Sequence, residues 1–423
     1  MTTIFALSSG APPAAIGIVR ISGPEAGQAL IRLCGALPPE RTASLRTVRD
    51  AAGEVLDRAL VLWFPGPASA TGEDCAEIHC HGGRAVIAAI ETALAAMPGL
   101  ARAEPGAFTR RAFTNGRIDL AEAEGLADLL TAETELQRRV AQAQASGEAS
   151  RQVAEWRDEV LRLSARIEAL LDFSDEDDVD TLSEDFRRDV DRLVTALEGW
   201  LARPPAERLR DGVRVVLSGP PNAGKSSLFN MLLSSEAAII SPVAGTTRDV
   251  IERPVAIDGV PFVLIDTAGL RSETGDEIEA VGIARAAEQM ASADIVLWLG
   301  TEGKGPDGAL EIETRVDLED QQKENPAARV SGKTGEGLSA LAAILVERAG
   351  TLLPRPGESA VNARQRRCLE RAYGALHEIG NASDPLLIGE SLRAARAAFD
   401  DLLGCASTEH MLDALFGRFC IGK

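Results

Sequence analysis

The stretch "GPPNAGKSS", residues 219–227, constrains the fold of this chain more than any other feature. It follows the apolar run "VRVVLS", precedes a helical stretch, and fits G-x-x-x-x-G-K-S/T with Gly219, Gly224, Lys225 and Ser226. In that pattern the glycines let backbone N–H groups turn toward phosphate oxygens, the lysine reaches the β and γ phosphates, and the hydroxyl holds Mg²⁺. The sequence therefore predicts a nucleotide-binding strand, loop and helix of α/β type.

Two further motifs follow in the order typical of GTPases. "GTTRD" occupies residues 245–249, and "DTAG", residues 266–269, closes the apolar run "VPFVLI". Thr247 is the expected switch residue for Mg²⁺ and the γ-phosphate, Asp266 the carboxylate behind Mg²⁺, and Gly269 the amide facing the γ-phosphate. Together the motifs predict a complete GTPase domain.

The guanine-recognition motif departs from the usual N-K-x-D. "TRVD", residues 314–317, keeps Asp317, which can accept hydrogen bonds from guanine N1 and N2, but has Thr314 in place of asparagine. Arg315 can replace the lysine because its flat guanidinium stacks over a base. "SGK", residues 331–333, would supply the loop over the base edge. We expect guanine to be preferred over adenine, with reduced affinity.

The residue after "DTAG" is Leu270, where a small GTPase of the Ras type carries a glutamine that orients the attacking water. Leucine cannot orient water, so hydrolysis must use another group or a second subunit. The acidic candidates nearby are Glu273, Asp276, Glu277 and Glu279.

Two proline-rich joints, "ARPPAER" (202–208) and "LLPRPGES" (352–359), bracket the nucleotide-binding segment and predict that it is an inserted domain. The sequence on either side is expected to form one discontinuous helical domain, since domain termini often lie close together. The predicted segments are 1–117, mixed α/β; 118–207, helical; 208–352, a GTPase domain with a doubly wound sheet; and 353–423, helical with a terminal tail.

Helical periodicity is regular outside the insertion. Apolar residues recur at spacings of three and four, which favours amphipathic helices, in Leu120, Ala123, Ala127 and Leu130; in Val160, Leu163, Ile167 and Leu170; and in Leu193, Leu197 and Trp200. The N-terminal segment differs, because "IGIVRIS" alternates like a strand and glycines are frequent. "CAEIHCH" offers Cys75, His79, Cys80 and His81 as metal ligands, but its alternation favours a strand and no matching pair stands at zinc-site spacing.

Composition narrows the class of partner and the compartment. The net charge of −20 repels phosphate backbones, so a partner would have to contribute much of the affinity for any RNA. No apolar stretch approaches the ~20 residues needed to cross a bilayer, and "MTTIFALSSGAPP" lacks the pattern of a signal peptide. Six dispersed cysteines favour free thiols. We expect a cytoplasmic protein without a membrane partner.

The chain ends in "RFCIGK", which places Cys420 four residues from the end. Prenylation is not expected, because Gly422 and Lys423 do not fit the pattern that follows a prenylated cysteine. The residues alone leave two interpretations open, a frayed end and an end held in place by the rest of the protein.

Taken together, these motifs resemble those of the MnmE family, also called TrmE, of bacterial tRNA-modification GTPases. The resemblance covers nearly the whole chain and rests on "GIVRISG", "FPGPASATGEDCAEIHCHGG", "EPGAFTRRAFTNGRIDLAEAE", the GTPase insertion and the terminal "FCIGK". It implies a folate-binding N-terminal domain that forms a homodimer, a helical domain split by the GTPase, and a C-terminal cysteine returned toward the folate site. On this view "FCIGK" is a docked tail.

The resemblance also implies a reaction. With an FAD-dependent flavoprotein of the MnmG type, such an enzyme adds an aminomethyl-type group to C5 of the wobble uridine of tRNA, which is held largely through the partner. A tetrahydrofolate derivative, in the 5,10-methylene or 5-formyl form, supplies the one-carbon unit. The matching folate contacts are Arg20, Glu77, Arg117 and Lys423, with cations for glutamyl carboxylates and a carboxylate for pterin donors. The family pattern has lysine at position 117.

For the GTPase the resemblance implies activation by K⁺ and completion of the site when two GTPase domains meet. Glu279 matches the glutamate that positions water. Ser226 and Thr247 would contact Mg²⁺, and Asn222, Ser241, Val243 and Thr246 would contact K⁺. The matching GTP contacts are Asn222, Ala223, Gly224, Lys225, Ser226, Ser227, Ser241, Pro242, Val243, Ala244, Gly245, Thr246, Thr247, Asp266, Thr267, Ala268, Gly269, Thr314, Arg315, Asp317, Ser331, Gly332 and Lys333.

Two questions stay open at this point. Cys420 serves either in the modification chemistry, with its thiolate favoured by Lys423, or as a small buried residue that packs a docked tail. For the whole chain, the alternatives are a ribosome-assembly GTPase, which usually brings a basic RNA-binding domain, and a GTP-dependent switch with no chemistry of its own.

Overall fold

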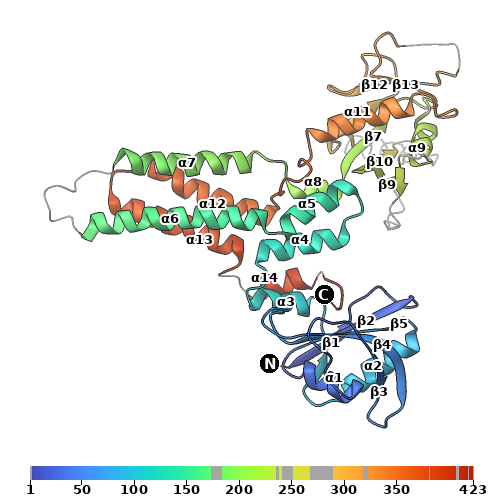
Figure 1. The fold of residues 1–423 in the computed structure, drawn as a ribbon. Coiled ribbons are helices and arrows are strands. Elements are labelled where there is room, and N and C mark those ends of the chain that lie inside the picture. Colours follow the sequence, from blue (N-terminus) through green and yellow to red (C-terminus); the bar gives the residue numbers. More distant parts are fainter. Residues whose placement is uncertain are drawn as a thin grey trace, which may run out of the picture. The chain divides into compact units, whose positions relative to one another are not determined.

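The computed structural model describes residues 2–172, 183–234, 238–240, 251–266, 289–317, 323–380, 382–405, 409–417 and 419–422 (Figure 1). The chain divides into two compact units, Met1–Ala127 with Asp400–Lys423, and Asp128–Phe399. Among the described helices, none has the length and apolar character needed to span a membrane.

The first unit is built on a six-stranded sheet of order β3-β4-β5-β2-β1-β6, with helices α1 and α2 on one face. Alternating residues of the strands, such as Phe5, Val19, Ile21 and Ile78, are fully buried against these helices, as period-two patterning requires. The predicted strand "IGIVRIS" is confirmed as β2. The bounds are β1 Thr3–Leu7, β2 Ile16–Ser22, β3 Ser44–Arg49, β4 Val55–Phe64, β5 Cys75–His81, β6 Leu100–Arg102, α1 Ala26–Cys34 and α2 Arg84–Ala95.

"CAEIHCH" is confirmed as a strand, β5. Its alternation divides the four candidate metal ligands between the two faces of the sheet, because Cys80 is buried in the core with α1 and α2, whereas Glu77 and His79 lie on the opposite face. Within the described residues no group of three or more His, Cys, Asp or Glu is placed to hold a metal ion.

The opposite face of the sheet is covered only in part. Helix α3 (Ala107–Thr114) packs Phe108 against Ile4 and Ala6 of β1. The C-terminal segment, with α14 (Glu409–Phe416), joins the same unit by burying Phe416 and Phe419 beside Leu120 at the start of α4 (Leu120–Thr131). The end of the chain is therefore part of the N-terminal unit.

The second unit contains a bundle of long helices formed from both sides of the insertion, in which α6, α7, α12 and α13 run side by side (Figure 1). Trp156 of α6 meets Trp200 of α7 edge-on at 5.3 Å and Phe399 of α13 at 6.1 Å between ring centroids. The discontinuous helical domain is thus confirmed. The bounds are α5 Glu135–Ala145, α6 Glu148–Asp172, α7 Glu184–Leu201, α8 Ala206–Asp211, α12 Ala363–Ile379 and α13 Pro385–Leu403.

The three stretches predicted as helices from their periodicity are confirmed as α4, α6 and α7. The stripes along α6 and α7 are buried at Val160, Leu163, Ile167, Leu193 and Leu197, as expected of amphipathic helices in a bundle. In α4, Leu130 is helical as predicted, but its side chain is 44% exposed because it lies beyond the apolar cluster that covers the start of the helix.

The two proline-rich joints lie next to each other. Pro205 and Val361 form a β-bridge, and the Ala206 N–H donates to the Val361 carbonyl at 3.1 Å. Both connections between bundle and insertion therefore pass through one point, which is how a whole domain is accommodated inside a helical bundle.

The inserted domain is a seven-stranded sheet of order β13-β12-β11-β7-β10-β9-β8, with β7, β10, β11, β12 and β13 parallel. The apolar runs "VRVVLSG", "VPFVLID" and "ADIVLWLG" contain β7, β10 and β11, three of these parallel strands. The bounds are β7 Val213–Ser218, β8 Ala238–Ile240, β9 Ile251–Ile257, β10 Val260–Asp266, β11 Ile295–Trp298, β12 Leu310–Thr314, β13 Ala328–Val330, α9 Lys225–Ser234 and α11 Leu338–Gly350.

The connection from β11 to β12, residues 299–309, contains no helix, although parallel strands are usually joined through one. Instead, the loop packs against the side chain of Trp298. The Trp298 indole N–H donates to the Thr301 carbonyl at 2.8 Å, and Gly300 and Gly305 lie against the ring. Gly300 and Gly305 allow this, because a Cβ at either position would lie 2.6 or 2.7 Å from the ring.

Candidate functional site

The loop between β7 and α9 has the geometry of a phosphate-binding loop. Gly219 and Gly224 have φ of +153° and +90°, and Asn222, which is not a glycine, has φ of +61°. These left-handed residues turn successive peptide groups. The Lys225 ammonium is buried and donates to the carbonyls of Gly219 and Pro220, each at 2.9 Å. The loop therefore wraps around the lysine and holds its ammonium through two of its own carbonyls.

Of the residues predicted to hold Mg²⁺, Ser226 is described, together with Asp266, the predicted carboxylate behind the ion. The Ser226 hydroxyl, in the first turn of α9, donates to Asp266 Oδ2 at 2.7 Å. Asp266 is buried at the end of β10, which pairs with β7 in parallel. This arrangement is suited to Mg²⁺, with the Ser226 hydroxyl as a direct ligand and the Asp266 carboxylate behind the ion.

We name residues 314–317, at the end of β12, the base loop, because they are the residues predicted to recognise the base. The base loop is joined to the phosphate-binding loop by hydrogen bonds. The Thr314 hydroxyl donates to the Ala223 carbonyl at 2.7 Å. Arg315, with φ of +63°, turns back and its guanidinium donates to the Asn222 carbonyl. Two consecutive residues of the base loop thus hold two consecutive carbonyls of the phosphate-binding loop.

The loop after β13 contacts the last residue of the base loop, Asp317. The Ser331 hydroxyl donates to Asp317 Oδ1 at 2.8 Å and accepts from the N–H groups of Lys333 and Thr334 at 3.2 and 3.1 Å. Gly332 lies so close to Ser227 of α9 that a Cβ would come within 3.0 Å of its backbone. The loop after β13 therefore orients the Asp317 carboxylate.

All these loops follow the carboxyl ends of parallel strands. β7, β10, β12 and β13 end at Ser218, Asp266, Thr314 and Val330. Because such ends share one edge of a sheet, residues that are more than 100 positions apart in the chain meet at one nucleotide site. Sequence order alone could not set these distances.

A second group of polar residues lies on the partly covered face of the N-terminal sheet. Arg20 of β2 donates from Nε and Nη2 to Glu77 Oε1 of β5 at 3.0 and 2.9 Å, in strand positions directly opposite each other. His79 bonds Glu77 Oε2 at 3.1 Å. Arg20 also lies over the Phe108 ring, 5.8 Å from its centroid. We name Arg20, Glu77 and His79 the polar cluster.

The environment keeps Glu77 ionised. Burial alone would raise its pKa, but the hydrogen bond with His79 and the charge and hydrogen bonds of Arg20 outweigh burial, so the pKa lies below its ordinary value. Sequence reasoning missed His79 as a member of this site. The signal was its i, i+2 spacing from Glu77, which puts both side chains on one face of a strand.

The other predicted folate contacts belong to the same unit. Arg117 is exposed, and its side chain lies against Gly72, where a Cβ would be 3.2 Å from Arg117 Cγ. The preceding residue, Thr71, bonds at 2.7 Å to Ser22, which shares a face of β2 with Arg20. Arg117 therefore borders the sheet face that carries the polar cluster.

The C-terminal tail is docked. Phe419 is 4% exposed, and the Ser8 hydroxyl donates to the Gly422 carbonyl at 2.8 Å. Ser8 follows β1, two residues after Ala6, the strand partner of Arg20. The frayed-end interpretation is therefore wrong, and the tail returns to the end of β1, the strand that pairs with β2. The Cys420 side chain is exposed, so its interpretation as a buried packing residue is also wrong.

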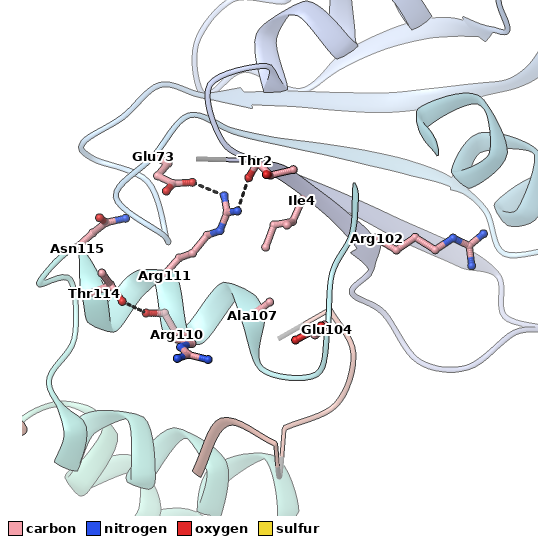
Figure 2. A pocket seen from close by; sticks show the side chains of 10 residues that line it. All are labelled: Thr2, Ile4, Glu73, Arg102, Glu104, Ala107, Arg110, Arg111, Thr114 and Asn115. Atoms are coloured by element: carbon pink, nitrogen blue, oxygen red, sulfur yellow. Dashed lines mark hydrogen bonds and ion pairs between the residues drawn. The ribbon is translucent and has the colours of Figure 1, made fainter. Parts of the chain in front are cut away.

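Figure 2 shows a different feature of this unit, a cavity of about 440 Å³ between the start of β1, the end of β6 and α3. Arg111 on its wall donates to Glu73 at 2.6 Å and to the Thr2 carbonyl. Neither Arg20 nor Glu77 lines the cavity. The cavity and the polar cluster therefore have different lining residues.

Several predicted site residues lie outside the described residues. They are Ser241, Pro242, Val243, Ala244, Gly245, Thr246, Thr247, Thr267, Ala268, Gly269, Glu279 and Lys423, together with Leu270 and its acidic neighbours Glu273, Asp276 and Glu277.

The parallel sheet and its strand-end loops define a P-loop nucleotide-binding protein of the GTPase class. Comparisons with known proteins give the family. The family model described as "MnmE helical domain" matches residues 120–420, and the one described as "GTP-binding protein TrmE N-terminus" matches residues 3–117. The chain belongs to the MnmE family of tRNA modification GTPases.

Individual relatives agree with this placement. The tRNA modification GTPase MnmE of Erythrobacter litoralis is 64% identical over 424 residues, covering 100% of both chains. The protein of the same name from Novosphingobium aromaticivorans is 56% identical over 434 residues, covering 100% of this chain and 99% of its own. The solved G domain of the T. maritima FeoB iron transporter is 25% identical, with 32% of this chain and 98% of that chain covered and a TM-score of 0.23.

Proposed function

We propose that this chain couples GTP hydrolysis to tRNA modification and acts in the cytoplasm with an FAD-dependent flavoprotein of the MnmG type. The product would be a wobble uridine that carries an aminomethyl-type group at C5. The observation that supports this proposal most directly is the polar cluster in the same unit as the docked tail, in a chain that also carries the GTPase loops. A second polar site, separate from the nucleotide loops, suits an enzyme that binds a second small molecule.

The chemistry of the polar cluster fits a tetrahydrofolate derivative. The ionised Glu77 suits the N–H donors of a pterin, and the guanidinium groups of Arg20 and Arg117 suit its glutamyl carboxylates. Lys423 would add a third cation. When bound, the folate supplies the one-carbon unit, while these residues hold and orient it. Cys420 is the exposed thiol of the docked tail and the candidate for the modification chemistry.

For GTP, the proposed roles follow the loop geometry. Lys225 and the phosphate-binding loop hold the phosphates, and Ser226, backed by Asp266, holds Mg²⁺ together with Thr247. Asp317 accepts from the guanine N–H donors. The remaining proposals are K⁺ at Asn222, Ser241, Val243 and Thr246, and Glu279 as the residue that positions water.

The exposed part of the N-terminal sheet supports a homodimer. Leu45 of β3 and Leu60 of β4 are strand partners, 49% and 45% exposed, and Leu60 is also opposite His79 of β5. Paired residues point to the same side of a sheet, so this apolar row is continuous with the polar cluster. A second copy that covered the row would bury apolar surface and enclose the proposed folate site.

Isothermal titration of the purified chain with 5-formyltetrahydrofolate tests the folate site. We expect Glu77→Gln and Arg20→Ala to weaken binding at least tenfold, because each removes a charged hydrogen bond. Arg102→Ala is the matched control, since Arg102 lines the cavity of Figure 2 instead. Loss of binding only in the Arg102 variant would overturn the assignment. No folate binding, with GTP hydrolysis retained, would favour the switch without chemistry of its own.

GTP turnover in KCl and in NaCl at equal ionic strength, with ATP as a control substrate, tests the hydrolytic mechanism. We expect hydrolysis specific for GTP and strongly raised by K⁺. Equal slow rates in both salts would contradict the proposed K⁺ site and the transfer of the hydrolytic mechanism from the family.

A further inference from the structure

The base loop and the phosphate-binding loop are connected through the two residues at which this chain departs from N-K-x-D. Thr314 donates its hydroxyl hydrogen to the Ala223 carbonyl at 2.7 Å, and Arg315 donates to the Asn222 carbonyl. The Thr314 side chain also packs over Gly224, where a Cβ would lie 3.4 Å from its hydroxyl oxygen. Both departures therefore make specific contacts.

These contacts fix the direction of two peptide groups. In a trans peptide the N–H points opposite to the carbonyl of the same group. When Thr314 holds the Ala223 carbonyl, the Gly224 N–H is turned away from the base loop, and the bond from Arg315 to the Asn222 carbonyl does the same for the Ala223 N–H. A phosphate-binding loop depends on such oriented N–H groups.

The same bond limits what Thr314 can do for the base. A threonine hydroxyl has one hydrogen, whereas the asparagine amide of the usual motif has two. Since that one hydrogen goes to the Ala223 carbonyl, Thr314 has none left to donate to a purine acceptor. Guanine presents two acceptors on one edge, N7 and O6, and donors at N1 and N2 on another.

Asp317 is arranged differently. Its Oδ1 accepts from Ser331, whose hydroxyl is itself held by the N–H groups of Lys333 and Thr334. A carboxylate has about four acceptor positions, so the bond from Ser331 orients Asp317 and leaves acceptor capacity for the N1 and N2 donors.

We propose that Thr314 is a positioning residue for the phosphate-binding loop, and that this chain recognises guanine without a hydrogen bond from position 314 to N7. The inference rests on the base site proposed above. It implies that 7-deazaguanine nucleotides, in which N7 is replaced by a C–H group, bind as well as guanine nucleotides.

The test is competition of GDP and of 7-deaza-GDP against a fluorescent N-methylanthraniloyl-GDP on the full-length chain with Mg²⁺. For the unaltered protein we expect the two dissociation constants to agree within about twofold, because no bond to N7 is lost. A preference for GDP of fivefold or more would overturn the proposal. This comparison needs no variant and therefore does not depend on how a variant folds.

Two substitutions at the same position separate positioning from base recognition. Thr314→Asn restores a second amide hydrogen, and we expect it to create a preference for GDP over 7-deaza-GDP of roughly three- to tenfold, the value of one neutral hydrogen bond. Thr314→Val keeps the shape but loses the bond to Ala223, so both nucleotides should weaken by the same factor, roughly three- to tenfold. Unchanged affinity in Thr314→Val would overturn the positioning role.

Asp317→Ala distinguishes failure of this inference from failure of the base site. We expect both nucleotides to weaken more than tenfold, because a charge-assisted contact to the donor edge is lost. If Asp317→Ala left GDP affinity unchanged, the base site itself would be misassigned. If it weakened GDP while the unaltered protein strongly preferred GDP over 7-deaza-GDP, only the role given to Thr314 would be wrong.

Discussion

Gly422 should hold the C-terminal tail in place, and Gly422→Ala should release it. The residue has φ of +93°, and a Cβ there would lie 2.1 Å from the Leu7 carbonyl oxygen and 2.8 Å from Ser8 Cα. Both of those atoms are backbone, so the contact cannot be relieved by rotating a side chain. The docked conformation is therefore accessible to glycine and strained for any other residue.

The size of the effect follows from these contacts. A left-handed conformation costs an L-residue about 1–2 kcal/mol, and separating the chain at this point loses the Ser8 hydrogen bond, worth about 1 kcal/mol. The docked tail should lose about 2–3 kcal/mol relative to the free tail. Since 1.4 kcal/mol corresponds to a factor of ten, the open population should rise about 30- to 150-fold.

Amide hydrogen exchange measures this population. The Phe419 N–H bonds the Phe416 carbonyl at 3.1 Å, so its exchange reports opening of the tail. We expect that exchange to accelerate by the factor above, while amides of β2 keep their rates. Gly53→Ala is the control, because Gly53 has φ of +83° but no atom within 4 Å of the added Cβ. Unchanged exchange of Phe419 in Gly422→Ala would refute the reasoning.

Three further changes test other parts of the structure. Gly305→Ala places a Cβ 2.7 Å from Trp298 Cγ and should destabilise the inserted domain by about 1–3 kcal/mol in urea denaturation, whereas Gly350→Ala, which faces open space, should not. Phe186→Ala removes a 2% exposed ring from the bundle and should cost about 3–5 kcal/mol; Leu161→Ala, 48% exposed, should change the unfolding free energy by less than about 0.5 kcal/mol. Because the pKa of Glu77 is lowered on folding, its charge stabilises the protein above the unfolded pKa of about 4.3, and this stabilisation is lost as pH falls through the folded pKa. The unfolding free energy of the unaltered protein should therefore fall more steeply than that of Glu77→Gln below pH 5, and parallel acid curves would contradict this.

The sequence predicted local structure well where a pattern is repeated or chemically demanding. The glycines and lysine of the phosphate-binding loop, the period-two runs of β2 and β5, and the three-and-four spacing along α6 each depend on neighbours in the chain. Such spacing predicts a helix but not the burial of every side chain on it. Leu130 continues the spacing of α4 and is helical, yet its side chain is 44% exposed.

The sequence by itself determined the class of domains, their order, and the types of group available for phosphate, Mg²⁺ and guanine, because these depend on residue type and short-range spacing. Only the tertiary structure decided that Thr314 bonds Ala223, that His79 joins Arg20 and Glu77, and that Gly422 returns to Ser8 across 414 positions. Strand order and register bring such residues together, and both are set by the burial of whole sheet faces and helix faces, which no short stretch of sequence contains.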